Sequence, residues 1–317
     1  MAKKKRVLVI FGGPSNEHNV SLASGRLVKD NLNQMSYEAH ECRITKTGLW
    51  SFDEQKPLKL PKALEYLQRK KFTVVFLALH GKFGEDGKIQ SILEALKIPY
   101  TGSDSASSAI AMNKDLSNKI AKFYDFKVPN YSIFTKFSLP VWNVFPCVVK
   151  PVSQGSSYGA YIVKKPKELK KAVSQAFNYD DKIMIQDFIR GREITCGVLE
   201  KSGRPIALPP TEIIPRVSEF FDYKAKYKIR GSKEVTPAKL NKKQTGLVKN
   251  LALEAHKMFG CQGMSRTDFI LRGKIFYYLE TNTIPGLTKT SLLPQQANAA
   301  GIDFSKMLDL IIESAIK

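Results

Sequence analysis

The chain has 317 residues, of which 43% are hydrophobic and 25% charged, a composition typical of a folded protein with about two or three domains. The longest apolar runs, residues 7–11 and 74–79, are far shorter than the roughly 20 residues that span a bilayer, so we expect no membrane segment. The formal net charge of +21 raises nucleic acid as a partner, but the basic residues are mostly lysine and are scattered without a known binding motif, so we expect no dedicated nucleic-acid site.

The first hundred residues alternate strand and helix patterns. Residues 6–11 form an apolar run that ends in Gly12-Gly13, and apolar side chains then recur at helical spacing as far as Leu32. A second apolar run, residues 73–79, reads as a buried strand, and Asp86 could cap a helix after it. This alternation predicts a parallel sheet covered by helices.

The pattern changes near residue 104, where the small polar residues 103–108 suggest a hinge. Residues 209–243 are polar, basic and without periodicity, and a loop of that length is often a lid. The remaining patterns predict helices at 111–123, 166–177, 244–259 and 304–316, and strands at 145–150, 160–163, 182–188, 193–199, 269–271 and 275–282. The fold class is therefore α/β (α+β).

The four cysteines are far apart in the sequence. They form no CxxC motif and no cluster with histidine, so a zinc site or a disulfide framework is not expected. Four reduced cysteines suit a cytoplasmic location. The residues concerned are Cys42, Cys147, Cys196 and Cys261.

Polar residues interrupt two apolar strands near the C-terminus. Arg266 and Asp268 lie two apart, as do Glu280 and Asn282, so each pair shares one face of a strand. If the strands pair about the turn at 272–274, two carboxylates meet an amide, an oxygen donor set that suits Mg²⁺. The alternative is an exposed polar strand face; because these residues break strongly apolar runs, we favour the metal.

A lysine precedes a glycine- and serine-rich loop in the middle of the chain. Lys150 follows an apolar strand, and the loop at 154–159 could fold its N–H groups over nucleotide phosphates, with Lys114 nearby. The segment is not a P-loop, because no GxxxxGK[ST] occurs. A plain hairpin turn is the alternative.

Three further segments could contribute to a site. Glu17, at the start of the first helix, either complements the helix dipole or holds a substrate ammonium, and the residues alone favour neither. His80 begins a loop at the end of a predicted parallel strand, where open α/β sheets bind ligands, but it could equally be structural. The aromatic and basic run 220–227 could cover phosphates or stack on a base.

Taken together, these segments resemble one family. In the same order along the chain, this sequence closely resembles the D-alanine–D-alanine ligases of the ATP-grasp superfamily. The matching segments are residues 11–22, 80–87, 100–103, 112–114, 149–157, 222–227, 266–268 and 279–291.

The resemblance implies a three-domain ATP-grasp architecture with an N-terminal parallel-sheet domain. The expected boundaries are 1–103, 104–187 and 188–317, with the lid at about 209–243. It also implies a cytoplasmic enzyme, a homodimer, that joins two D-alanines through an acyl phosphate for peptidoglycan synthesis. The expected cofactors are ATP and two Mg²⁺, which Mn²⁺ could replace.

The resemblance also assigns residue roles. It implies ATP contacts from Lys114, Lys150, Ser156, Ser157, Gln186, Phe188, Ile189, Glu193 and Lys226, and Mg²⁺ ligands from Asp268, Glu280 and Asn282. It implies substrate contacts from Glu17 to the first ammonium, from Ser291 to the second carboxylate, from Arg266 and the Gly286 N–H to the oxyanion, and from His80. Ser156, Tyr227 and Glu17 would form a hydrogen-bonded link across the closed site.

Two positions depart from the family pattern. Gln186 stands where many members have glutamate near the adenine, and Tyr158 stands where the phosphate loop often has valine. Tyr227, retained in the lid, favours an amine as second nucleophile over D-lactate. The alternatives are a ligase that uses D-serine or another second substrate, and a non-catalytic basic nucleotide-binding protein, which should have lost its metal ligands.

Overall fold

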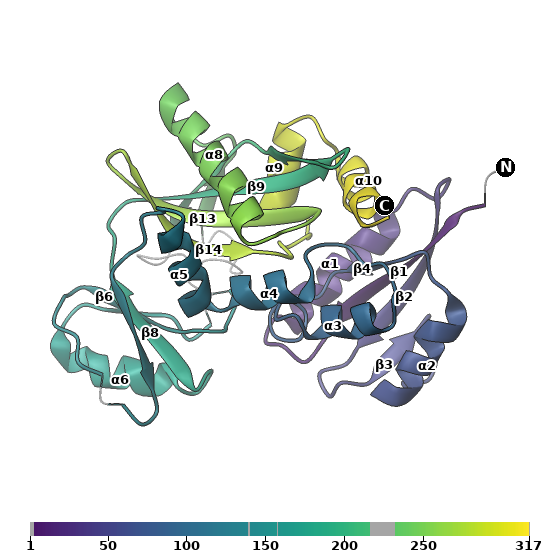
Figure 1. Ribbon diagram of the computed structural model, residues 1–317, viewed down its shortest axis with the longest axis horizontal. Coiled ribbons are helices and arrows are strands. Elements are labelled where there is room, and N and C mark those ends of the chain that lie inside the picture. Colours follow the sequence, from purple (N-terminus) through teal and green to yellow (C-terminus); the bar gives the residue numbers. More distant parts are fainter. Residues whose placement is uncertain (1–2, 139, 157, 216–231, 317) are drawn as a thin grey trace.

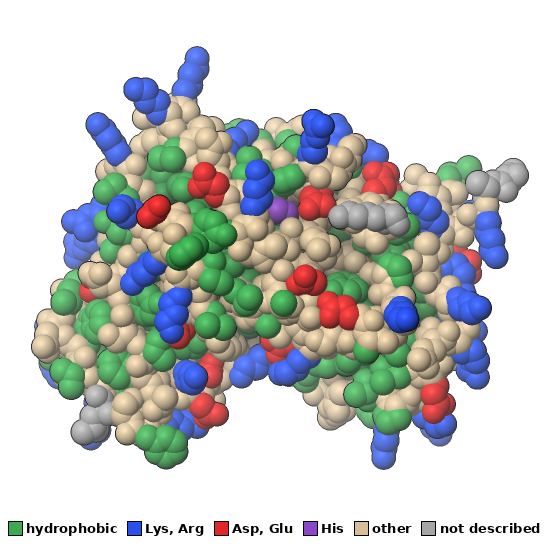
Figure 2. All heavy atoms as spheres, in the orientation of Figure 1, with side chains coloured by type: hydrophobic (Ala, Val, Ile, Leu, Met, Phe, Trp, Pro, Cys, Tyr) green, Lys and Arg blue, Asp and Glu red, His purple; other side chains and the backbone are tan. Residues whose placement is uncertain are grey.

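The computed structural model describes residues 3–138, 140–156, 158–215 and 232–316, which form three sheets (Figure 1). The N-terminal sheet occupies one end of the molecule, and two sheets from the rest of the chain occupy the other. None of the described helices is long and apolar enough to cross a bilayer. Figure 2 shows lysine and arginine side chains spread over the visible face instead of gathered in one patch.

The first sheet has the strand order β3-β2-β1-β4, and β1 pairs in parallel with both β2 and β4. This confirms the predicted parallel sheet. Strands β1 and β4 are apolar runs because both of their faces are buried. The elements of this part are β1 (Lys5–Gly12), α1 (His18–Asn31), β2 (Tyr37–Ile44), β3 (Trp50–Phe52), α2 (Leu60–Lys70), β4 (Val74–Leu77) and α3 (Lys88–Ala95).

Two predicted features of the chain around residue 100 are wrong. The N-cap of α3 is Gly87 in a left-handed conformation, with φ of 85°, and not Asp86. The predicted hinge at 103–108 is largely the helix α4 (Ser105–Met112), because the Asp104 side chain accepts a hydrogen bond from Ser107 N. A cap of this kind satisfies a helix N-terminus within a polar, small-residue sequence.

The single helix predicted at 111–123 is instead split in two. Asn113 ends α4 in an extended conformation, and its side chain then caps α5 (Lys114–Phe123) by accepting from the N–H groups of Asp115 and Leu116. This break places Lys114 at the first position of a helix, where its side chain can turn toward the neighbouring sheet.

The second sheet is antiparallel in the order β5-β8-β6-β7. Helix α6 packs on it around a core that includes Val149, Val173 and Ile185. The elements are β5 (Tyr131–Thr135), β6 (Cys147–Pro151), β7 (Tyr161–Val163), α6 (Pro166–Ala176) and β8 (Lys182–Asp187).

The third sheet has six antiparallel strands, and its main path runs β12-β11-β9-β13-β14. The prediction of a structureless loop at 209–243 is wrong at both ends, where β11 and β12 pair with each other and β11 pairs with β9. Residues 216–231 of that loop lie outside the described residues. The elements are β9 (Arg192–Lys201), β10 (Arg204–Ala207), β11 (Thr211–Pro215), β12 (Ser232–Val235), α8 (Lys242–Met258), β13 (Met264–Arg272), β14 (Ile275–Asn282), α9 (Leu292–Ala299) and α10 (Phe304–Ala315).

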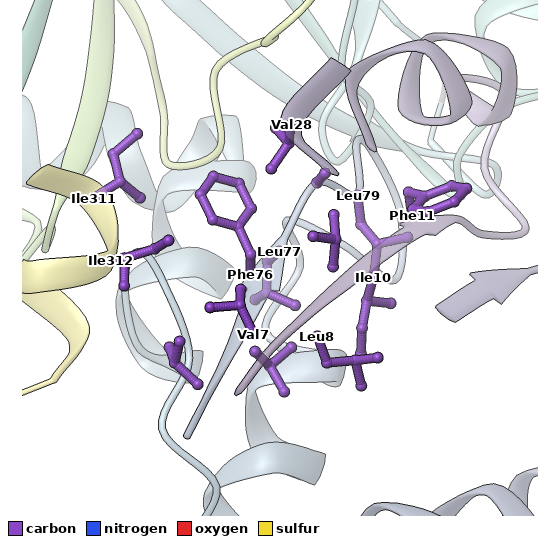
Figure 3. Close-up of a cluster of buried hydrophobic side chains, with 14 of the residues drawn as sticks. Val7, Leu8, Ile10, Phe11, Val28, Phe76, Leu77, Leu79, Ile311 and Ile312 are labelled. Carbon is purple, nitrogen blue, oxygen red and sulfur yellow. The ribbon is translucent and has the colours of Figure 1, made fainter. Parts of the chain in front are cut away.

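Packing crosses the expected domain boundaries, which stay predictions. The C-terminal helix α10 inserts Ile311 and Ile312 into the core of the N-terminal sheet, beside Val7 and Phe76 (Figure 3). In the same way, Ala121 at the end of α5 belongs to the core of the third sheet. The last helix of the chain therefore completes the first core.

We expect Ile311→Ala to lower the free energy of unfolding by about 2–5 kcal/mol, because Ile311 is fully buried and its loss leaves a cavity. The matched control is Glu313→Ala, an exposed residue two positions along the same helix, which should change it by less than about 0.5 kcal/mol. Urea unfolding of both variants measures the difference, and equal losses would contradict this packing.

Candidate active site

The polar residues near the C-terminus meet in a strand hairpin. In the pairing of β13 with β14, Arg266 lies opposite Asn282 and Asp268 lies opposite Glu280. This confirms the predicted hairpin, and it brings the two carboxylates from adjacent strands together. A shift of register follows directly after Asp268.

Arg266 and Asp268 form a buried ion pair. Arg266 Nε donates to Asp268 Oδ1 at 2.9 Å and Nη2 donates to Oδ2 at 2.8 Å, while the hydroxyl of Thr195 on β9 donates to Oδ1 at 2.6 Å. Burial alone would lower the pKa of Arg266, but the Asp268 carboxylate outweighs that effect and raises the pKa. Arg266 is therefore a permanent cation at the base of the site.

Glu280 pairs with a lysine from another part of the chain. Lys114 Nζ, on α5, lies 3.2 Å from Glu280 Oε2 and donates to the carbonyl oxygen of Gln154 at 2.7 Å. Lys114 is buried, and these two oxygen partners offset the cost of burying its positive charge. The lysine thus joins the hairpin to the loop between β6 and β7.

The donors at the hairpin fit a hard divalent cation. Asp268 and Glu280 supply carboxylate oxygens, and Asn282 on the same strand as Glu280 adds an amide oxygen. The amide nitrogen of Asn282 is buried without a hydrogen-bond partner among the described residues. The described residues contain no group of three or more histidine, cysteine, aspartate or glutamate side chains of metal-binding geometry. Mg²⁺ needs fewer, since it commonly uses one or two carboxylates with waters and substrate phosphates.

A cavity lies between the second and third sheets and is lined by residues of both. Its lining combines two lysines with apolar and amide side chains. Its lining includes Lys114, Lys150, Tyr158, Gln186, Phe188, Ile189, Glu193, Asp268 and Glu280. The structure therefore brings together every described residue predicted to contact ATP except Ser156, which lies in the adjoining cavity.

A second cavity adjoins the first, and Glu280 lines both. Its lining comes from the N-terminal part, the β6–β7 loop, the strands β12, β13 and β14, and the segment after β14. It includes Glu17, His80, Glu85, Ser156, Arg266, Asn282, Gly286 and Ser291. The predicted substrate residues within the described chain therefore surround one space.

The Glu17 carboxylate accepts a hydrogen bond from one loop and lies close to glycines of two loops. The hydroxyl of Ser156 donates to Glu17 Oε1. A Cβ at Gly155 would lie 2.6 Å from Glu17 Oε2, and a Cβ at Gly81 would lie 2.8 Å from it. The two glycines therefore leave room for the Glu17 carboxylate in this position between two loops.

His80 uses both ring nitrogens within the protein. Because Ile284 O can only accept, Nδ1 carries the proton and donates to it at 3.2 Å, and Nε2 then accepts from the Ser24 hydroxyl at 2.9 Å. Ser24 Oγ in turn accepts from Leu287 N at 3.3 Å. These bonds hold the main chain on either side of Gly286. The predicted substrate contact of His80 stays a prediction.

Ser291 is the N-cap residue of α9 and ends the segment after β14 that carries Gly286. Its Oγ accepts from Thr288 N at 3.0 Å and pairs with Thr288 Oγ1 at 2.8 Å. A Cβ at Gly286 would lie 2.7 Å from Ser291 Oγ, so the glycine allows the two residues to approach.

Sequence reasoning missed three residues of this site. Ser24 lies on the inner face of α1, and Thr195 within an apolar strand, so neither breaks a pattern. Glu85 is buried, accepts from Gly81 N at 2.6 Å and lines the second cavity. Burial and the neighbouring Glu17 raise the pKa of Glu85. In the sequence, Glu85 stands in a Gly-Glu-Asp-Gly segment, which by itself indicates only a loop.

Three predicted site residues, Ser157, Lys226 and Tyr227, lie outside the described residues. Their predicted contacts with ATP and with Ser156 and Glu17 stay predictions.

We expect His80 to make the protein less stable in mild acid. Burial lowers the pKa of His80 to about 4, below its ordinary value of 6.5. Below pH 6.5 the unfolded chain therefore binds a proton that the folded chain does not, and stability is lost as the pH falls from 6.5 toward 4. Between pH 7 and pH 5 the loss due to His80 is about 2 kcal/mol.

The His80→Gln variant should lack this loss. Urea unfolding at pH 7 and pH 5 measures it, with the decline steeper in the wild type than in the variant. Parallel declines would contradict a neutral buried imidazole.

The two halves of the chain match two models of the same family. The model described as D-ala D-ala ligase N-terminus matches residues 6–103, and the model described as D-ala D-ala ligase C-terminus matches residues 120–313. Among curated proteins, D-alanine–D-alanine ligases of Leptospira interrogans and Rhizobium meliloti are 38% and 40% identical, each with 98% of both chains covered.

Solved structures agree in fold. A D-alanine–D-alanine ligase of Bacillus anthracis, solved in complex with ATP, is 34% identical with a TM-score of 0.81, covering 98% of this chain and 97% of that one. A D-Ala:D-Ser ligase of Enterococcus faecalis is 31% identical with a TM-score of 0.84, covering 99% and 100%. Two family models that together span most of the chain, and relatives matched over nearly their whole length, place this protein in the D-alanine–D-alanine ligase family, whose members have the ATP-grasp fold.

Proposed function

We propose that this protein performs the reaction for which its family is named, the ATP-dependent joining of two D-alanines, in the cytoplasm and as a homodimer. The observation that carries the proposal is the meeting of two cavities at Glu280. One presents lysines suited to phosphates, and the other presents Glu17 and Arg266, suited to an amino acid. Because Glu280 lines both cavities, a phosphate at this end of the first cavity can reach an amino acid in the second.

The first step activates a poor electrophile. A carboxylate oxygen of the first D-alanine attacks the γ-phosphorus of ATP, the bond to the β-phosphate oxygen breaks, and ADP leaves an acyl phosphate. Lys114 and Lys150 offset charge on the phosphates, while Glu17 binds the ammonium of the same D-alanine. Mg²⁺, held by Asp268, Glu280 and Asn282, would neutralise further phosphate charge and orient the transferring group.

The second step forms the peptide bond. The amine of the second D-alanine attacks the acyl carbon, and the resulting tetrahedral oxyanion lies between Arg266 and the Gly286 N–H. The carbon–oxygen bond to phosphate then breaks, inorganic phosphate leaves, and the amine loses a proton. Ser291 binds the carboxylate of the second D-alanine and so directs its amine. Donors placed in advance at an oxyanion contribute about 3 kcal/mol each.

A second candidate is a ligase that accepts D-serine as second substrate. The likeness to the D-Ala:D-Ser ligase supports it, because that relative aligns with this chain as fully as the D-alanine–D-alanine ligases do. A third, a non-catalytic nucleotide-binding protein, is disfavoured because Arg266, Asp268 and Glu280 are present and mutually placed.

Product analysis separates these candidates. The protein is incubated with ATP, Mg²⁺ and equimolar D-alanine, D-serine, D-lactate and L-alanine, and the products are measured by mass spectrometry. We expect D-alanyl–D-alanine to dominate, with one ADP released per dipeptide. A dominant D-alanyl–D-serine would favour the second candidate, and no condensed product with intact ATP would overturn the proposal.

Glu280→Gln should nearly abolish dipeptide formation, because it removes one of two carboxylate charges expected at the metal. We expect turnover to fall by about 10²-fold or more and the Mg²⁺ concentration for half-maximal rate to rise. Glu254→Gln makes the same change on the exposed side of α8 and should leave both quantities unchanged. Wild-type turnover and Mg²⁺ dependence in Glu280→Gln would refute the metal assignment.

Arg266→Ala should lower kcat by about 10²- to 10³-fold with less effect on the KM for ATP, because the charge it stabilises develops only during the reaction. Steady-state kinetics with ATP varied measures this split. A defect confined to the KM for ATP would contradict the oxyanion role.

A further inference from the structure

Tyr158 reaches from the loop between β6 and β7 to the N-terminal part of the molecule. Its hydroxyl donates to the carbonyl oxygen of Asn16 at 3.1 Å, although the two residues are 142 positions apart. Asn16 directly precedes Glu17 and lies in the turn between β1 and α1. The bond therefore joins the loop to the turn that carries the proposed ammonium ligand.

The same loop contacts this turn at two other points. Ser156 donates to the Glu17 carboxylate, and the Cα of Gly155 approaches it so closely that a Cβ would lie 2.6 Å from Glu17 Oε2. Both contacts depend on Glu17, the side chain that would have to bind the substrate. Tyr158 instead bonds to a backbone oxygen that has no expected part in the chemistry.

Tyr158 also lines the cavity expected to hold ATP, with Lys150 and Gln154. The main chain is turned tightly there, because Tyr158 N donates to Gly155 O at 3.1 Å. One end of the tyrosine thus lies against the nucleotide cavity, and its hydroxyl bonds beside the amino-acid cavity.

We propose that Tyr158 is a positioning residue that holds the β6–β7 loop closed over the amino-acid site through its bond to Asn16 O. This rests on the proposed function, since closure matters because an acyl phosphate must be kept from water. A bond of this kind contributes enough to shift a closing equilibrium about two- to tenfold. The apparent affinity for the substrate beneath the loop falls by the same factor when the bond is lost.

The test is Tyr158→Phe, which removes only the hydroxyl and keeps the ring against the nucleotide cavity. We expect the KM for the first D-alanine to rise about two- to tenfold, the KM for ATP to stay within about twofold, and the ratio of ADP to dipeptide to rise above that of the wild type. The matched control is Tyr161→Phe in β7, whose hydroxyl makes no hydrogen bond within the described part of the chain. It should leave all three quantities unchanged.

A measurement independent of turnover accompanies the kinetics. With D-alanine and a non-hydrolysable ATP analogue bound, hydrogen exchange in a peptide covering residues 152–160 should be faster in Tyr158→Phe than in the wild type or in Tyr161→Phe. Faster exchange with an unchanged KM and ADP ratio would overturn the positioning role, and unchanged exchange would overturn the proposal outright. A wild type that forms no dipeptide but shows the exchange difference would overturn the proposed function and leave the role of Tyr158 in closing the loop supported.

Discussion

The site depends on keeping several carboxylates together around two adjoining cavities. Four carboxylates line these cavities, those of Glu17, Glu85, Asp268 and Glu280. Neighbouring negative charges repel one another more strongly inside a protein than in water. Arg266 and Lys114 supply the opposite charge from within the protein. Burial and the neighbouring Glu17 raise the pKa of Glu85, so the protein environment disfavours a further negative charge there. The proposed divalent cation and substrate ammonium would add positive charge to this space.

The architecture follows from that requirement, because no single sheet presents all of these groups. The parallel sheet contributes loops at the ends of β1 and β4, the second sheet contributes the loop between β6 and β7, and the third sheet contributes the β13–β14 hairpin. Small residues allow the loops to meet: Gly81 and Gly155 both approach Glu17 to within the space of one methyl group. The first and third sheets share a core, whereas the second sheet, which carries the β6–β7 loop, has a core of its own.

Sequence periodicity predicted the elements that carry the chemistry better than those at the edges. The hairpin was predictable because apolar strands interrupted by polar pairs have only one way to place those pairs on a common face. Strand β2 was not predictable from periodicity. Strand β3 pairs only with the last three residues of β2, so the part of β2 that carries the charged Glu38 is not covered by β3 and lacks the apolar pattern of a buried strand. Strands β11 and β12 were missed because tertiary pairing, not propensity, makes them strands. The cavity lining beyond the motifs, such as Ser24 and Thr195, carries no local signal at all.

The burial of α10 in the first core has a consequence for how the chain reaches its folded state. During synthesis the strands β1 and β4 emerge early, but the apolar surface that receives Ile311 and Ile312 stays uncovered until α10 has been made. The N-terminal part therefore cannot finish folding as an independent unit while the rest is being made. Because the same sheet carries the loops with Glu17 and His80, α10 supports the amino-acid site from below although it contributes no residue to it.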